Sequence, residues 1–504
     1  MAQSAVAPTR PSLVGQSCLY FFSNVARRGL SLFLLPIYTR YLSPAEYGAI
    51  ELIELLAAVM IVVVGVPIFS DSITRIYFDY SDARDRGKVI STGMMLTILL
   101  SSVLILIGVC GGGRASNALF HSAGYASLIT WTFTSVLLSN VAEVGLAYQR
   151  IRRRAGFVAI YSCAQFALAG GLNVYFIAYA KKGIWGFVLS KLISLGIGAA
   201  ILLFRTLRET GFGFSVECAK RMGLFGRNLI VTGIGFFIIN FSDRGFLNHF
   251  RTTADVGIYA LAYKFGFVIS YLVGNPFKSV WEVNVFEDMH ELRWRYQAAN
   301  MARILALSVA GAALLLSIFA NPIIRTVASS SYASAATLIP ILTFAYAVRE
   351  MGDFFGTILF INKRMAQYTS VVMLSACLNL VLDWFLIRAW GATGAAYATL
   401  LTWVAYTAAC CVMAQREHRL PLETRGFTLL AAICFLAVAG VFSIGSIGLV
   451  PDLAIRITVT VVAVVLIWKS RYITADEHTA IRNRLKVPFA ALRSALTADP
   501  RSLD

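Results

Sequence analysis

Two adjacent arginines, Arg27 and Arg28, lie near the middle of an apolar segment that runs from Leu13 to Tyr38. A guanidinium at the centre of a bilayer costs about 2.5–3.5 kcal/mol on insertion scales, so such a residue faces a polar interior or pairs with an acid. Guanidinium groups bind phosphate through two parallel hydrogen bonds. The pair therefore indicates a polar cavity inside a membrane protein and an anionic ligand, such as a phosphate or diphosphate group.

Two acids on the next apolar segment, Glu51 and Glu54, suggest an alternative role for the arginines. They are predicted at a similar depth and one helical turn apart, so each could neutralise an arginine in a structural ion pair. Consecutive residues on a helix point about 100° apart, so the two arginines cannot share one partner. We therefore expect at least one arginine to face the cavity, and both acids remain candidates for coupling or gating.

Lys264 is the clearest candidate ligand in the second half of the chain. It lies well inside an apolar segment, beside Tyr259, Tyr263 and Tyr271, and no acid is three or four residues away. Its alternative role is that of a lysine that snorkels to the interface or pairs across helices. Lys191, in an apolar segment of the first half, is a similar but weaker candidate.

Other polar residues in apolar segments have positions that also suit a structural role. Arg349 and Asp353 are four residues apart and can pair on one helix face. Asp243 and Arg244 lie near one end of their segment, which suits either a local role or a gate. An asparagine within a membrane binds a sugar hydroxyl or, more often, another helix. The candidate ligands are therefore Arg27, Arg28, Lys264, Lys191, Arg244, Arg349, Asn24 and Asn240, and the candidates for coupling or gating are Glu51, Glu54, Asp243 and Asp353.

The composition predicts that an integral membrane protein carries these residues. Of the 504 residues, 58% are hydrophobic and 14% are charged, and the mean hydropathy is +0.71, which a soluble domain does not sustain. Backbone polar groups must bond internally in lipid, and segments this long are helices rather than barrel strands. We predict an all-α polytopic protein with about 14 transmembrane helices, at 13–38, 46–69, 90–110, 124–147, 156–180, 183–204, 227–249, 256–281, 303–326, 335–360, 368–388, 391–414, 426–448 and 452–469.

The net charge of +18 is typical of nucleic-acid binding, but its distribution along the chain favours membrane topology instead. If the N-terminus is cytoplasmic, cytoplasmic segments hold about 30 of the 44 lysines and arginines, as the positive-inside rule requires. The strongest local signal is a short loop between two predicted helices that carries Arg150, Arg152, Arg153 and Arg154. We expect both termini in the cytoplasm.

The sequence lacks the motifs of several other functional classes. The eight cysteines include no C-x-x-C spacing and the five histidines are scattered, so neither a disulfide framework nor a metal site is predicted. No Walker A loop, dinucleotide fingerprint or H-E-x-x-H sequence is present. We therefore expect a transporter rather than an enzyme, with no cofactor and with H⁺ or Na⁺ as the candidate coupling ion.

An internal repeat organises the chain. "AEYG" at 45–48 matches "ADVG" at 254–257, and "GIWG" at 183–186 matches "GATG" at 391–394, with offsets of 209 and 208 residues. An even number of predicted helices separates the members of each pair, so the two copies are parallel repeats. The predicted organisation is a first lobe over 1–205, a cytoplasmic linker over 206–226, a second lobe over 227–414, two additional helices over 415–470 and a cytoplasmic tail over 471–504.

Three longer segments resemble a known family. They are "LPIYTRYLSPAEYGAIELIELL" (35–56), "GVPIFSDSITRIYFD" (65–79) and "SDRGFLNHFRTTADVGIYALAYKFG" (242–266). Together they resemble polysaccharide transporters of the multidrug/oligosaccharidyl-lipid/polysaccharide superfamily, and most of all its Wzx-type flippases. The resemblance implies a V-shaped, two-lobed fold with a central cavity that opens alternately to each side of a bacterial inner membrane. It also implies that cationic cavity residues hold the anionic headgroup of the substrate.

The resemblance implies a lipid substrate and a set of partners. Wzx-type flippases move undecaprenyl-diphosphate-linked oligosaccharide repeat units from the inner to the outer leaflet, for O-antigen, capsule or exopolysaccharide. A polysaccharide polymerase and a chain-length regulator are the expected protein partners. The alternatives are a lipid II flippase of peptidoglycan synthesis, a cation-coupled multidrug antiporter and a membrane-embedded glycosyltransferase. Arginines on the first predicted helix, where an antiporter would carry an acid, argue against the antiporter.

Overall fold

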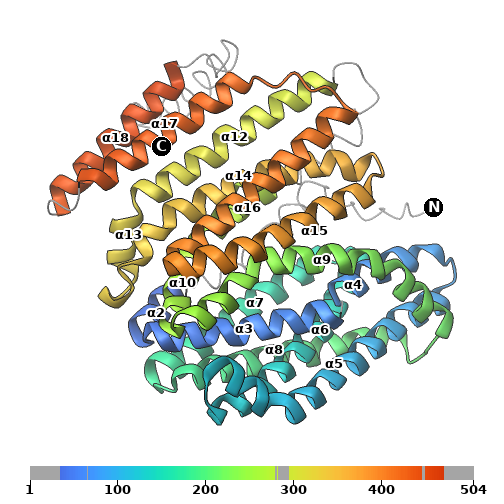
Figure 1. The fold of residues 1–504 in the computed structure, drawn as a ribbon. Helices are drawn as coiled ribbons and strands as arrows, with labels where there is room; N and C mark the ends of the chain where they lie inside the picture. The colour runs from blue at the N-terminus through green and yellow to red at the C-terminus, as the bar shows by residue number, and fades with distance from the viewer. Residues whose placement is uncertain (1–33, 65, 279–280, 282–293, 445–448, 470–504) are drawn as a thin grey trace, which may run out of the picture.

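The computed structural model describes residues 34–64, 66–278, 281, 294–444 and 449–469, and these residues are almost entirely helical (Figure 1). Nine helical segments among them are long and apolar enough to cross a membrane. The segment 365–417 contains two of the predicted helices, joined at a kink at Gly391. The all-α membrane fold predicted from the sequence is therefore confirmed.

The first lobe consists of α2 to α8. Its helices are α2 (Leu35–Tyr41), α3 (Pro44–Val64), α4 (Val66–Asp79), α5 (Ala83–Phe120), η1 (Ala123–Tyr125), α6 (Ala126–Ile151), α7 (Ala155–Asn173), η2 (Val174–Tyr179) and α8 (Gly183–Thr210). Several helices extend beyond their apolar cores: the predicted segment 90–110 lies inside α5, which is 38 residues long. Hydropathy detects only the apolar part of a helix, whereas its hydrogen bonds continue into the polar flanks.

The second lobe consists of α9 to α16, and α17 and α18 pack beside α12 at its outer side. The helices are α9 (Val216–Phe250), α10 (Thr253–Ile269), η3 (Ser270–Gly274), α12 (Trp294–Ile318), α13 (Ala320–Val327), η4 (Ser330–Tyr332), α14 (Ala335–Ile361), α15 (Met365–Leu382), η5 (Asp383–Ile387), α16 (Arg388–Glu417), α17 (Thr424–Ile444) and α18 (Leu449–Lys469). Figure 1 shows the blue-to-green first lobe below the yellow-to-red second lobe, with α9 and α10 along the boundary. Most of the predicted linker is helical, since only residues 211–215 separate α8 from α9.

The two ends of the bundle differ in charge. One end carries the loops at 80–82, 152–154, 211–215, 362–364 and 418–423, and we call it the basic end. Ion pairs tie neighbouring helices there: Arg154 lies 2.6 Å from Glu209, and Arg364 lies 2.9 Å from Glu417. The other end, which we call the opposite end, carries the turns that enter α3, α6, α8, α10, α14 and α16.

Local structure confirms the repeat. The two copies begin α3 and α10 with the same capping arrangement, in which Ser43 and Glu46 in the first copy correspond to Thr252 and Asp255 in the second. Gly183 and Gly391 both have positive φ, at 53° and 58°, a backbone conformation that favours glycine. A π-helical turn precedes each of these glycines, at η2 and η5.

The lobes touch at the opposite end, where the two repeat-related helix starts cross. A Cβ atom at Gly48 would overlap the carbonyl oxygen of Thr253, and one at Gly257 would overlap that of Pro44. The two glycines therefore let α3 and α10 approach until their backbones are in contact. Around this crossing, the Tyr332 hydroxyl donates to the Leu42 carbonyl at 3.1 Å, so the lobes are joined at this end.

Candidate functional site

A cavity of about 370 Å³ lies at the boundary between the lobes, just inside the crossing of α3 and α10. Its volume is in the range of small-molecule sites. Four of the predicted site residues line it, together with seven aromatic side chains and one isoleucine. The lining residues are Tyr38, Tyr47, Ile50, Glu51, Glu54, Phe187, Phe241, Arg244, Tyr263, Lys264, Phe267 and Tyr271.

Lys264 reaches the cavity from α10 of the second lobe. Its Nζ lies 3.1 Å from a carboxylate oxygen of Glu51, which belongs to α3 of the first lobe. The ammonium also lies 4.9 Å from the ring centroid of Tyr47 and 6.0 Å from that of Tyr38, within cation–π range. Lys264 is thus a cavity cation whose partners come from the other lobe. No acid lies three or four residues from it along its own helix, so the sequence around it did not reveal this pairing.

Arg244 approaches the same carboxylate from α9. Its Nε lies 3.6 Å from the second oxygen of Glu51, and its Nη1 lies 3.0 Å from Asp243. The guanidinium also sits 4.4 Å from the Tyr263 ring centroid. Its side chain is only 4% exposed, and its Nε has no hydrogen-bond partner among the described residues. A buried guanidinium N–H beside the cavity is therefore available to an oxygen ligand.

Glu54 and Lys191 form a second ion pair at the edge of the cavity, at 2.6 Å, within the first lobe. Lys191 comes from α8 and also lies 5.9 Å from the Phe187 ring centroid. The described lining residues therefore carry two acids and two cations, and the ammonium of Lys191 adjoins one of the acids. An anionic ligand would have to compete with these carboxylates for the cations.

The aromatic lining was not predicted as a site, although Tyr259, Tyr263 and Tyr271 beside Lys264 were noted in the sequence. Tyr38, Tyr47 and Phe187 come from the first lobe, whereas Phe241, Tyr263, Phe267 and Tyr271 come from the second. The Tyr38 hydroxyl donates to Asn173 at 3.0 Å, which fixes one of these rings. Aromatic rings present flat apolar faces, and tyrosines add a polar edge. This combination suits a ligand that has both apolar and hydroxyl-bearing faces.

Three predicted residues lie elsewhere in the second lobe. Arg349 pairs with Asp353 at 3.6 Å, as their spacing suggested, and lies 5.1 Å from the Trp403 ring centroid. Asn240 accepts a hydrogen bond from the Tyr346 hydroxyl at 3.1 Å. None of the three lines the cavity described above. Arg27, Arg28 and Asn24 lie outside the described residues, so their roles stay predictions.

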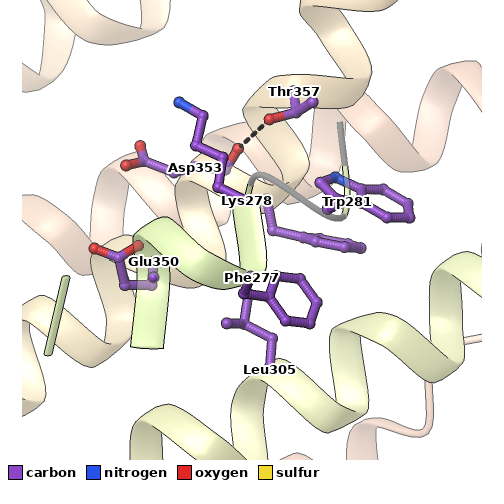
Figure 2. Close-up of a pocket in the computed structure, with 9 residues that line it drawn as sticks. Phe277, Lys278, Trp281, Leu305, Glu350, Asp353 and Thr357 are labelled. Carbon is purple, nitrogen blue, oxygen red and sulfur yellow. Dashed lines mark hydrogen bonds between the residues drawn. The ribbon is translucent and has the colours of Figure 1, made fainter. Parts of the chain in front are cut away.

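A second, much smaller cavity lies within the second lobe. Its volume of about 10 Å³ is near the lower limit for one water molecule, so it cannot hold a headgroup. Figure 2 shows Glu350 and Asp353 on one side of it and the rings of Phe277 and Trp281 on the other. Glu350 is buried and accepts a hydrogen bond from Ser270.

Sequence reasoning missed two buried acids of the second lobe, Glu350 and Asp383. Asp383 is fully buried and accepts a hydrogen bond from Ser242 at 2.7 Å. Their positions inside apolar segments were the available signal. No group of three or more metal-binding side chains was found among the described residues.

The sequence is similar to those of known proteins. Residues 37–337 match the family model described as Polysaccharide biosynthesis protein. The chain is 20% identical over 406 residues to a Haloferax volcanii protein named Probable low-salt glycan biosynthesis flippase Agl15, covering 78% of this chain and 82% of that protein. It is 24% identical over 268 residues to protein 1 of the Lsg locus of Haemophilus influenzae, covering 51% of this chain and 62% of that protein's length.

The fold is also similar to a solved structure. A structure titled Lipid II flippase MurJ, inward closed conformation, has a TM-score of 0.70 to this chain, at 13% identity. The similarity covers 90% of this chain and 99% of that one. Because the identity is so low, this likeness concerns the fold alone.

Proposed function

The chain belongs to the family of polysaccharide biosynthesis proteins, and we propose that it is a flippase for undecaprenyl-diphosphate-linked oligosaccharides. Its relative from Haloferax volcanii is named as a glycan biosynthesis flippase, which supports this assignment. The reaction is translocation from the inner to the outer leaflet, so it requires no covalent step and no cofactor.

The placement of Arg244 and Lys264 is the observation that carries this proposal. Both belong to the second lobe, and both line a cavity that also borders the first lobe. A diphosphate could replace its hydration shell with the guanidinium and ammonium groups. The surrounding aromatic rings provide faces against which sugar rings can pack. The prenyl tail would remain in the lipid, because only the headgroup is too polar to cross.

We propose that the cavity opens alternately to each side of the membrane. At the opposite end the backbones of α3 and α10 are in contact, and we propose that this contact closes the cavity there. We propose that the basic end faces the cytoplasm, as the positive-inside rule predicts, so the headgroup enters from that side. Separation of the two helices at the opposite end would then release the headgroup into the outer leaflet of the bacterial inner membrane. A polymerase and a chain-length regulator would act on it there.

A deletion strain tests the proposal. We expect loss of surface polysaccharide, while the lipid-linked oligosaccharide accumulates on the inner leaflet, where an impermeant sugar-oxidising reagent cannot reach it in intact spheroplasts. Expression of the full chain should restore both the polysaccharide and reagent access. Failure to make the precursor at all would argue for an enzyme, whereas accumulation of peptidoglycan precursor with cell lysis would argue for lipid II as the substrate.

A further inference from the structure

Glu51 connects the two lobes inside the cavity. It belongs to α3 of the first lobe, and each of its carboxylate oxygens faces one cation of the second lobe, at 3.1 Å for Lys264 and 3.6 Å for Arg244. Its side chain is only 12% exposed, so this attraction acts in a partly desolvated place where charges interact strongly. The carboxylate therefore occupies the place where an anionic ligand would meet both cations.

The ion pair between Glu51 and Arg244 is not reinforced by a hydrogen bond. The 3.6 Å separation is an ion pair but not a hydrogen bond, and the Arg244 Nε remains without a hydrogen-bond partner among the described residues. A diphosphate carries a negative charge on each of its phosphates, whereas a carboxylate carries a single one, and phosphate oxygens accept hydrogen bonds from guanidinium groups in bidentate geometry. A diphosphate at this position would therefore satisfy Arg244 better than Glu51 does.

The same carboxylate lies next to the contact that closes the opposite end. Glu51 follows Gly48 by three residues on α3, and Lys264 follows Gly257 by seven residues on α10. These separations are about one and two helical turns. The ion pair therefore holds the two helices together just inside the point where their backbones touch.

We propose that Glu51 is an internal counter-anion that the substrate diphosphate displaces, so that headgroup binding itself releases the closed end of the transporter. Once the diphosphate holds Lys264 and Arg244, Glu51 loses its attraction to the second lobe and faces a like charge. The repulsion acts between α3 and α10, where separation is needed. This inference rests on the proposed function, because it identifies the diphosphate as the competing anion.

Glu54 supplies a matched control. It lines the same cavity on the same helix, and Glu54→Gln changes the cavity charge by the same amount. Its partner Lys191 belongs to the same lobe, so this ion pair does not join α3 to α10. Only Glu51→Gln should loosen the closed end.

The experiment measures the distance between the lobes in the full chain in lipid nanodiscs. Spin labels are placed at Tyr41→Cys and Ala333→Cys, which are exposed and flank the contact between Leu42 and Tyr332. The native cysteines are replaced by serine, and transport by this background is verified first. The probe is undecaprenyl diphosphate, and undecaprenol serves as the uncharged control. Probe affinity is measured in the same samples.

We expect the probe, but not undecaprenol, to lengthen the distance in the wild-type background. Glu51→Gln should lengthen it without any probe and should raise probe affinity about 5- to 150-fold, the usual range for two coupled binding events. In Glu54→Gln the distance between the spin labels should remain short without the probe and lengthen with it. If Glu51→Gln accumulates poorly, it is combined with Lys264→Gln, which leaves no unpaired charge between the two positions. In this double variant the distance between the spin labels should also be long without the probe.

Two results would overturn the inference. If the probe binds but the wild-type distance stays short, and Glu51→Gln also stays short, then Glu51 is a structural partner only, and the flippase proposal still stands. If undecaprenyl diphosphate binds no better than undecaprenol, the diphosphate is not the ligand, and both proposals fail together.

Discussion

At the residue scale, the cavity cations are held by aromatic rings as well as by carboxylates. Lys264 lies near Tyr47 and Tyr38, and Arg244 lies near Tyr263 and Phe241. Each cation–π contact is worth about 0.5–2 kcal/mol, depending on how far the cation is desolvated. An anion could therefore replace Glu51 while the rings keep both cations in place. Such positioning reduces the reorganisation that ligand binding would otherwise require.

We predict that Lys264→Ala lowers both export and abundance. The variant leaves Glu51 with Arg244 as its one remaining cation among the described residues. Breaking a buried ion pair costs about 3–5 kcal/mol, and the remaining arginine keeps the loss near the lower value. Adding Glu51→Gln should restore abundance but not export, as measured by membrane immunoblot and surface polysaccharide. Normal export by the single variant at normal abundance would refute a role for Lys264 in headgroup binding.

The arginines of the first apolar segment give a second residue-scale prediction. We expect alanine at one or both of Arg27 and Arg28 to abolish most export, because we predict that at least one guanidinium faces the cavity. Lysine at that position should restore part of the activity, since it keeps the charge but loses bidentate geometry. Surface polysaccharide in complemented deletion strains measures the effect. Full activity of both alanine variants would contradict the prediction.

At the element scale, two repeat-related helix starts make the closed end. The capping arrangements at Ser43 and Thr252 fix where α3 and α10 begin, and Gly48 and Gly257 lie one turn later. Each glycine faces the backbone of the other helix, so the contact has the self-complementary form of a two-fold interface. Any side chain larger than a hydrogen atom at either position pushes the helices apart.

We predict that Gly48→Val prevents closure at the opposite end. Gly111→Val is the matched control, since it makes the same change within α5, where a Cβ atom would meet nothing within 4 Å. The distance between spin labels at Tyr41→Cys and Ala333→Cys should be longer in the Gly48 variant than in the control, and export should fall with it. Equal distances in the two variants would show that the crossing tolerates side chains.

At the scale of the whole molecule, two copies of one arrangement enclose a cavity that neither copy forms alone. Five of its lining residues come from α2 and α3 of the first lobe: Tyr38, Tyr47, Ile50, Glu51 and Glu54. The two cations that line it come from the second. Any movement of one lobe against the other therefore changes the cavity and its charge pairing together. We propose that this geometry links ligand binding to opening.

Topology is the whole-molecule prediction. Reporter fusions at His121 and Gly183 should read as extracytoplasmic, and fusions at Arg84, Arg153 and Gly213 should read as cytoplasmic, because the basic end follows the positive-inside rule. His121 is a better position than Gly112, which the hydropathy profile placed at the end of a segment but which lies within α5. Alkaline phosphatase and green fluorescent protein fusions distinguish the two sides. Reversed readings at two or more sites would reject the topology.

The sequence by itself determined the fold class, the positions of most helices and the repeat. Hydropathy is a local property, and lipid forces each long apolar segment into a helix, so no tertiary information was needed. The repeat was equally local, since "AEYG" at 45–48 and "ADVG" at 254–257 carry the residues that begin and pack α3 and α10. Helix ends were less accurate, because hydrogen bonding continues past the apolar core.

Only the tertiary structure decided which charged residues meet. Lys264 has no acid within its own helical neighbourhood, and its partner Glu51 is 213 residues away in the chain. Arg349 and Asp353, by contrast, are four residues apart, and they form the ion pair on one helix that this spacing suggested. Side-chain pairing across helices depends on how each helix is rotated and where it crosses its neighbour. Those quantities are set by packing, such as the glycine contact between α3 and α10, and not by the composition of either helix.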